Sequence, residues 1–216
     1  MDVIIESLPQ YWDGFLRTLF LAVVSGVIAL AFGTILAAMR VSPIAALRGF
    51  SMFYVEVTRN TPLTIIFFFS AIVLPRLGIK FDQFEVAAII ALSGYTAAFV
   101  AEAVRSGVNS VAVGQAEAAR SIGMTFGQVL GLIVLPQALR TVIPPLINIL
   151  IALVKNSSVA GAFFVLELFG YGLQLSNSHG DAVMWVLIGV AFFYLLLTVP
   201  LGLLAHYVER KVAIAR

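Results

Sequence analysis

The sequence predicts an all-α integral membrane protein with five membrane-crossing helices. Of its 216 residues, 61% are hydrophobic and 11% are charged, whereas about 25% of the residues in a soluble globular domain are charged. Five apolar stretches have lengths close to the roughly 17 to 25 residues that cross a hydrocarbon core about 30 Å thick. They leave little chain for a soluble catalytic domain. The chain has no cysteine, which excludes disulfides and thiolate metal sites, and its two histidines are too few to form a metal site alone.

The amino-terminal segment is expected to remain in the mature protein. Asp2, Glu6 and Asp13 stand where a signal peptide would be positively charged. Apolar and aromatic residues recur at helical spacing over 4–15, among them Tyr11. This pattern fits two structures: a short helix on the membrane surface with its rings at headgroup level, or a simple lead-in to the first span.

The predicted spans determine on which side of the membrane each loop lies. They cover residues 15–38, 54–74, 86–105, 130–154 and 183–206. An odd number of spans places the termini on opposite sides. Seven basic residues lie on the side of the carboxyl terminus and four on the other: Arg40, Arg48, Arg105, Arg120, Arg210, Lys211 and Arg216, against Arg17, Arg76, Lys80 and Lys155. Because cytoplasmic loops are enriched in Lys and Arg, the amino terminus is predicted outside and the carboxyl terminus in the cytoplasm.

The second span is predicted to bring ionisable residues toward the membrane. Its clean apolar run, Leu63–Leu74, has 12 residues, which form about 18 Å of helix and cannot cross about 30 Å of hydrocarbon. The helix is therefore expected to extend backwards over 56–61, through Pro62, which can bend it. Glu56 and Arg59 then either line a translocation path or form a pair at the cytoplasmic interface.

The fourth span and the segment after it are also unusual. Pro144 and Pro145 lie mid-span and leave backbone carbonyls without a helical partner, which a helix beside a watery path tolerates better than one surrounded by lipid. Residues 159–182 follow, with an apolar run of 11 residues, Val159–Phe169, that is too short to span. We expect a re-entrant or surface segment on the outer side.

The longest predicted cytoplasmic connection, residues 106–129, is rich in helix-forming residues. Within it, Gln115–Ile122 is expected to form about two helical turns that end at Gly123, because glycine suits a helix C-cap. A short exposed helix between two spans is either a simple linker or a docking element for another subunit.

This connection also carries a longer pattern. Glu117-Ala118-Ala119, three residues, Gly123, nine residues, Ile133, one residue and Leu135-Pro136 resemble the EAA loop of binding-protein-dependent ABC importer permeases at every position. The resemblance covers most of the chain, and three further segments look like polar amino-acid permeases: 54–62, 99–107 and 155–158. Within that family, three segments look most like actinobacterial glutamate or glutamine uptake permeases: 40–43, 59–64 and 115–120.

The resemblance implies a type I ABC importer permease fold and several partners. Two such subunits, identical or homologous, would pair in the bacterial plasma membrane, and an extracytoplasmic binding protein would deliver the amino acid. Each loop helix would dock on an ATPase subunit that binds ATP and Mg²⁺, with Glu117, Ala118, Ala119 and Gly123 making the contact and the spans rocking as rigid bodies. The chain has no phosphate loop of the form GxxxxGK followed by Ser or Thr. We therefore expect no cofactor, metal or enzymatic activity in this chain.

A substrate path is predicted from two polar sets. Glu56, Arg59, Asn60 and Thr61 come from the second span, and Lys155, Asn156 and Ser157 from the end of the fourth. The cations of Arg59 and Lys155 would compensate a substrate carboxylate. The structural alternatives are an ion pair of Arg59 with Glu56 or Glu102, and snorkelling of Lys155 to the interface.

Other functions remain open at this point. Importers for arginine, histidine or cystine share most of the same motifs. A stand-alone channel or secondary transporter often has internal repeats, and five spans do not divide into equal halves. An intramembrane protease needs a pair such as serine with histidine, but His179 falls in the predicted outer loop and His206 at the cytoplasmic end of the last span.

Overall fold

The structure, a computed structural model, describes residues 2–212 and contains helices and turns but no strand in that range, which confirms the all-α class. Within those residues, four helical stretches are long and apolar enough to cross a membrane: α2 (Leu8–Arg40), α6 (Phe84–Asn109), the run Phe126–Phe163 and α11 (Val183–Val212). The run Phe126–Phe163 joins α8 (Phe126–Gln128), a π-helical segment (Val129–Val134), α9 (Leu135–Asn156) and a 3₁₀ helix (Ser157–Phe163). Arg216, one of the residues used to predict orientation, lies outside the described residues.

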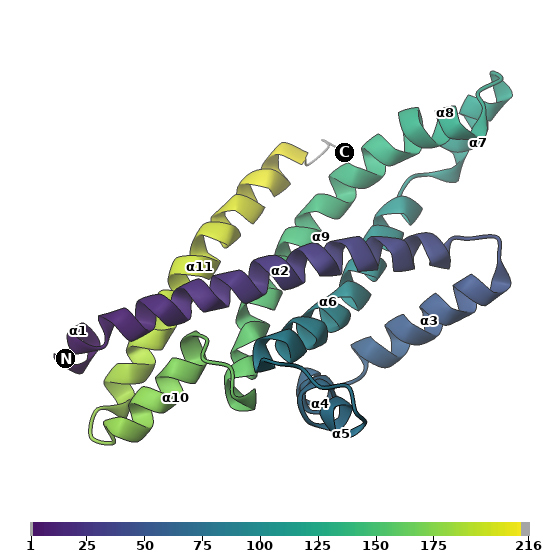
Figure 1. Cartoon of the computed structure of the whole chain (residues 1–216). Helices are drawn as coiled ribbons and strands as arrows, with labels where there is room; N and C mark the ends of the chain where they lie inside the picture. The colour runs from purple at the N-terminus through teal and green to yellow at the C-terminus, as the bar shows by residue number, and fades with distance from the viewer. Residues whose placement is uncertain (1, 213–216) are drawn as a thin grey trace.

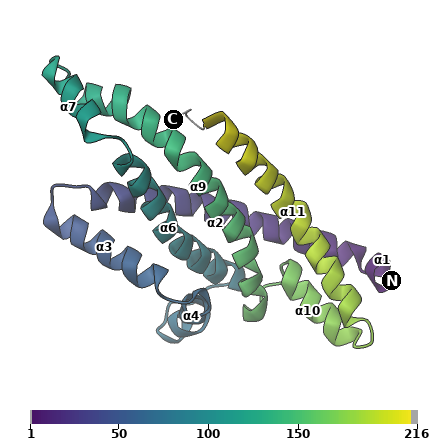
Figure 2. The same ribbon diagram turned by 180° about the vertical axis from the view of Figure 1, so that it is seen from behind.

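The long helices pack side by side, and the short ones gather at the two ends of the molecule. α2 packs along α6, α9 lies against both α6 and α11, and α10 (Leu168–Ser178) contacts α2 and α11 (Figures 1 and 2). α1 (Asp2–Glu6) and α10 lie near one end, whereas α7 (Val113–Ser121) and α8 form the opposite tip (Figure 1). The fold therefore separates the predicted outer segment from the predicted cytoplasmic loop.

A glycine allows α2 and α6 to approach closely. A Cβ atom added at Gly33 would lie 2.6 Å from Cβ of Val100 and 2.7 Å from the carbonyl oxygen of Ala97. Helices in lipid associate through such small residues, because lipid is as apolar as the side chains and provides no hydrophobic driving force. Buried small residues continue this interface, among them Ala29 and Ala101.

The second apolar stretch is not the continuous helix that the sequence predicted. α3 (Ala45–Arg59) and α4 (Leu63–Phe68) are bent by 106° at a short break, and a π-helical segment (Phe69–Val73) and α5 (Leu74–Arg76) follow α4. Pro62 has no N–H to donate, and a proline disfavours helical backbone at the residue before it. The prediction of one helix over 54–74 is therefore wrong, because Pro62 starts a new helix instead of merely bending the old one.

The amino-terminal residues lead directly into the first long helix. α1 is separated from α2 only by Ser7, and the three aromatic residues of 4–15 all belong to α2. Tyr11 is fully buried; its hydroxyl donates to the carbonyl oxygen of Val186 at 3.1 Å, and its ring stacks on Phe193 at 5.5 Å. The ring of Tyr11 is therefore packed inside the protein, and both interpretations of residues 4–15 remain predictions as to their depth in the membrane.

Candidate functional site

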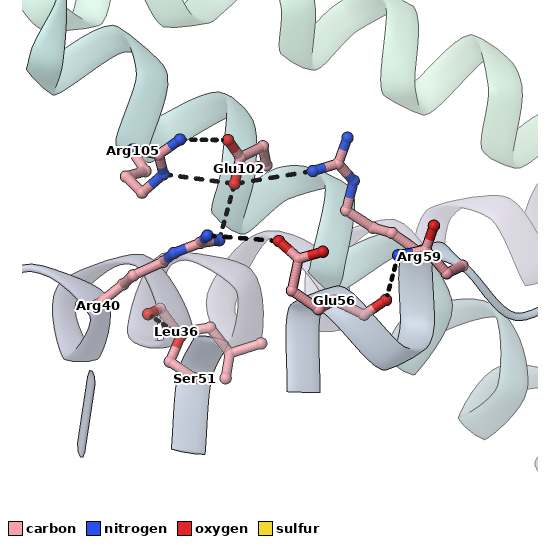
Figure 3. A network of polar contacts seen from close by, with 8 residues as sticks. Leu36, Arg40, Ser51, Glu56, Arg59, Glu102 and Arg105 are labelled. Carbon is pink, nitrogen blue, oxygen red and sulfur yellow. Dashed lines mark hydrogen bonds and ion pairs between the residues drawn. The ribbon is translucent and has the colours of Figure 1, made fainter. Parts of the chain in front are cut away.

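A cluster of charged side chains forms where α2, α3 and α6 meet (Figure 3). Glu102 on α6 accepts hydrogen bonds from Arg40 Nη1 at 2.8 Å and from Arg105 Nε at 3.3 Å, and a second Arg105 nitrogen contacts its other oxygen. Arg59, the last residue of α3, lies 3.8 Å from the same carboxylate. Arg40 also pairs with Glu56 at 3.7 Å. Three guanidinium groups thus face two carboxylates, which leaves one excess positive charge.

Two members of the cluster, one cation and one carboxylate, line a cavity. A cavity of about 270 Å³ is lined by Arg59 and Glu102 on one side and by Thr141 and Pro145 of α9 on the other. The guanidinium of Arg59 lies 5.7 Å from the ring centre of Phe99, which also lines this cavity. Such a site has a cation, a carboxylate, an aromatic face and a hydroxyl, which are groups able to hold the two charged ends and the body of an amino acid.

The rest of the predicted substrate path is only partly brought to this cavity. The side chains of Asn60 and Thr61 donate to carbonyl oxygens of α3, at 2.8 and 2.7 Å, and so close the end of that helix. Thr61 lines a different, larger and mostly apolar cavity of about 680 Å³ between α3, α4 and α6. Glu56 and Arg59 both belong to the charged cluster, in agreement with the ion-pair alternative for Arg59.

The second predicted set lies farther along α9. Lys155 is exposed, whereas Ser157 is buried and donates to the carbonyl oxygen of Val154 at 2.7 Å. Ile149, which lines the Arg59 cavity, precedes Lys155 by six residues, or about 9 Å of helix. Among residues 2–212, no hydrogen bond or ion pair joins Lys155, Asn156 or Ser157 to the charged cluster.

Sequence reasoning did not identify the full cluster. It used Arg40 and Arg105 as orientation signals and as parts of the segments that carry the resemblance, and it considered Glu102 as a possible partner of Arg59, but it did not join the three. The spacing of Glu102 and Arg105, three residues apart on one helix, was a usable signal for an ion pair. The role of Arg40 depends on the packing of α2 against α6 and has no local signature.

A buried carboxylate outside this cluster was also missed. Glu167 is fully buried at the start of α10 and accepts hydrogen bonds from the backbone N–H groups of Phe169 and Gly170 at 3.0 and 2.8 Å. The hydroxyls of Thr18 and Tyr194 also donate to it, at 3.2 and 2.7 Å. Glu167 therefore caps α10 and ties it to α2 and α11. Burial raises the pKa of its carboxyl above the ordinary value of 4.5, against the lowering effect of the four donors.

The predicted loop helix is present. α7 covers Val113–Ser121, and Gly123 follows it with φ of +90°, a backbone conformation that glycine adopts without strain. The N–H of Met124 donates to the carbonyl oxygen of Ala119 at 3.2 Å, as expected when glycine ends a helix. Ala119 is buried, whereas Glu117 and Ala118 are exposed at the tip of the molecule (Figure 1). A docking surface would need this exposure.

A metal centre has no support in the described part of the chain. Within residues 2–212, no group of three or more His, Asp or Glu side chains is arranged to hold a metal ion. The absence of a resident metal remains a prediction from the sequence.

Comparison with known proteins gives the family. A sequence model of the family described as "Binding-protein-dependent transport system inner membrane component" matches residues 9–214. This chain belongs to that family. The resemblance stated for its EAA loop is therefore confirmed at the level of the family, and the chain is a multi-pass protein of the inner membrane.

Individual relatives match almost the whole chain. It is 41% identical to the "Probable glutamine ABC transporter permease protein GlnM" of Bacillus subtilis, over 98% of this chain and 97% of that protein. It is 38% identical to the "Glutamate transport system permease protein GluC" of Corynebacterium efficiens, over 97% and 95%. Among solved structures, a chain from a crystal structure of an amino acid ABC transporter with histidines matches with a TM-score of 0.90 and 28% identity, over 96% of both chains.

Proposed function

We propose that this chain is the membrane-spanning subunit of an ATP-driven importer for a polar amino acid, with glutamine or glutamate as the transported molecule. The observation that carries the proposal is the near-complete match to relatives named as glutamine and glutamate permeases. The guanidinium of Arg59 in the cavity lining supports it, because every amino acid carries a carboxylate that a guanidinium binds well.

The proposed topology has five spans in a single domain over 1–216. The second span is formed by α3 together with the bent segment Leu63–Arg76, and the other four spans are the four long helical stretches. The distribution of basic residues supports an amino terminus outside and a carboxyl terminus in the cytoplasm. On this topology α7, within the loop 106–129, is cytoplasmic and α10 lies on the outer side.

The proposed partners follow from the family. Two permease subunits, identical or homologous, pair in the membrane, and an extracytoplasmic binding protein delivers the amino acid. An ATPase subunit binds ATP and Mg²⁺ and contacts α7 through Glu117, Ala118, Ala119 and Gly123, so that this chain performs no hydrolysis itself. The exposure of Glu117 and Ala118 supports the docking role.

The proposed substrate path is centred on Arg59. Its guanidinium faces the cavity shared with Thr141 and Pro145 of α9, and it pairs with Glu102 when no substrate is bound, whereas Glu56 pairs with Arg40. Asn60 and Thr61 hold the end of α3 in place. Lys155, Asn156 and Ser157 serve as a second polar set farther along α9.

A different polar amino acid is the second candidate. One of the matching structures is described as an amino acid ABC transporter with histidines, and another relative, 34% identical, is named an "L-cystine transport system permease protein" of Bacillus subtilis. Histidine, cystine and arginine therefore belong in any substrate test.

The experiment is a substrate panel. The permease is reconstituted in proteoliposomes with its ATPase and binding protein, and ATP-dependent uptake of labelled glutamine, glutamate, arginine, histidine and cystine is measured. We expect glutamine or glutamate to be taken up fastest. Faster uptake of histidine, arginine or cystine would contradict the proposed substrate, and absence of ATP-dependent uptake for all five would contradict an amino-acid importer.

A further inference from the structure

One glutamine side chain connects the tip of the molecule to the fourth long helix. The Nε2 atom of Gln137 on α9 donates to Oε1 of Gln115 on α7 and, at 2.9 Å, to the carbonyl oxygen of Ile133. Gln115 lies in the first half of α7, two residues before Glu117. Both hydrogens of one amide group are thus used, one within the α9 run and one across to α7.

Gln137 lies at a junction between two kinds of helix. Val129–Val134 is π-helical, so its backbone hydrogen bonds are shifted by one residue from the α-helical pattern. Pro136 follows and contributes no N–H. The amide of Gln137 donates to the carbonyl oxygen of Ile133 at this junction, one turn earlier in the same helical run. The bond to Ile133 holds the amide in the orientation in which it reaches Gln115.

This bond is the directional part of the contact. Within residues 2–212, the Gln115–Gln137 bond is the sole side-chain hydrogen bond or ion pair that joins α7 to another helix. The other side-chain hydrogen bond of α7, from Ser121 to the carbonyl oxygen of Ala118, stays inside that helix. The remaining contact is apolar, through the buried Ala119 and through Ala116 and Val134, which line a common cavity. Apolar contacts let two surfaces slide, whereas a hydrogen bond with fixed geometry resists sliding.

Gln137 also lies on the side of α9 that reaches the charged cavity. Residues four apart on a helix share a face, which places Gln137, Thr141 and Pro145 in one row, and Thr141 Oγ1 donates to the carbonyl oxygen of Gln137 at 3.1 Å. Thr141 and Pro145 line the cavity beside Arg59. One face of α9 therefore connects the contact with Gln115 to the proposed substrate path.

We propose that Gln137 is a positioning residue that transmits displacement of α7 to α9, and so couples the ATPase to the cavity beside Arg59. The inference rests on the proposed function and deepens it. When α7 moves with the ATPase, the Gln115–Gln137 bond pulls the start of α9, and Thr141 and Pro145 move with it as parts of one helix. Without the bond, α7 slides on its apolar contacts and hydrolysis proceeds without full transport.

The test applies the same chemical change to the two ends of one bond. Gln137→Glu replaces the donor by a carboxylate and loses both hydrogen bonds, whereas Gln115→Glu keeps the acceptor and the bond. The readout is the amount of glutamine or glutamate transported per ATP hydrolysed by the reconstituted complex with its binding protein. We expect Gln137→Glu to lower this ratio about two- to tenfold, the range that one net hydrogen bond spans, and Gln115→Glu to stay within about twofold of wild type.

A rescue variant distinguishes a positioning role of Gln137 from a role in folding alone. Combining Gln137→Glu with Gln115→Lys creates an opposite-charge contact across the same gap and is expected to restore the ratio. An unchanged ratio in Gln137→Glu, an equal loss in Gln115→Glu, or a failure of the rescue would each overturn the inference. If Gln137→Glu does not assemble, Gln115→Ala removes the same bond from the exposed helix, and an unchanged ratio there overturns the inference too. A wild-type complex whose ATPase does not respond to the loaded binding protein would instead overturn the proposed function.

Discussion

Arg40, the last residue of α2, donates to the carboxylate of Glu102 on α6 at 2.8 Å. Because Glu102 also contacts Arg59 and Arg105, one carboxylate holds together the ends of α2 and α3 and the adjoining turn of α6. The exposed fraction of the side chain is 14% for Arg40 and 24% for Glu102, so water screens this contact only in part. The position of Arg59 beside the cavity therefore depends on Glu102.

Glu102→Gln is predicted to destabilise the protein, because three guanidinium groups would lose their shared counter-charge. We expect a loss of about 1–3 kcal/mol, below the value for a fully buried pair because these groups are partly exposed. The measurement is thermal unfolding of the detergent-solubilised complex. Glu85→Gln is the control, because its partner Arg17 has a 45% exposed side chain. This variant should lose under about 1 kcal/mol of unfolding free energy. Equal shifts of the unfolding temperature in the two variants would show that the cluster around Glu102 does not stabilise the fold more than an exposed ion pair does.

Arg59→Ala is predicted to abolish uptake while the complex still assembles. The guanidinium is the cation that faces the cavity, and loss of a hydrogen bond to a charged group costs about 1.5–3 kcal/mol, so uptake should fall at least about tenfold. Uptake into proteoliposomes checks this, with assembly followed by co-purification of the ATPase. Arg76→Ala, on the exposed end of α5, should transport normally. Normal transport by Arg59→Ala would refute the assignment of the substrate path.

Glu117→Lys is predicted to uncouple the ATPase from transport, because it reverses the charge of an exposed residue of α7 at the proposed docking surface. Uptake should fall at least about tenfold, and the ATPase should no longer respond to the loaded binding protein. Glu209→Lys makes the same charge change near the end of α11 and is expected to retain coupling. Wild-type ATPase binding and uptake in Glu117→Lys would exclude this residue from docking.

Glu167 is predicted to make stability depend on pH. Burial raises its pKa above 4.5, so between 4.5 and the raised value the folded state keeps a proton that the unfolded state has lost. The stabilisation is complete below 4.5 and is lost as the pH rises through the folded pKa. Unfolding temperatures of the solubilised complex at a series of pH values should therefore show a decline in wild type that Glu167→Gln lacks. Identical pH profiles for the two proteins would show that Glu167 does not titrate in this way.

Much of the fold was predictable because hydrophobicity and turn residues are local signals. The long apolar stretches predicted helices. Gly123 predicted the end of α7, because a helix commonly ends at a residue with left-handed backbone, and glycine adopts that conformation without strain. The break at Pro62 was foreseen only as a bend. Whether a proline bends a helix or starts a new one depends on what the next segment packs against, in this case the buried contact of Leu63 and Phe67 with α6.

The candidate site was less predictable because its geometry is non-local. Arg59 and Glu56 were selected from their place near a membrane span, and the structure does bring them into one cluster. Their partner Arg40 comes from a different helix, and nothing in its sequence neighbourhood indicates Glu102. Lys155 looked equivalent to Arg59 by chemistry, but the helical rise along α9 sets it apart from the cavity.

The most direct test of the account is ATP-dependent uptake of labelled glutamine and glutamate by proteoliposomes that contain this chain with or without the ATPase subunit, in the presence of the binding protein. The account predicts uptake only when the ATPase and ATP are both present. Uptake of equal rate by this chain without the ATPase would contradict it and would indicate a stand-alone channel or secondary transporter.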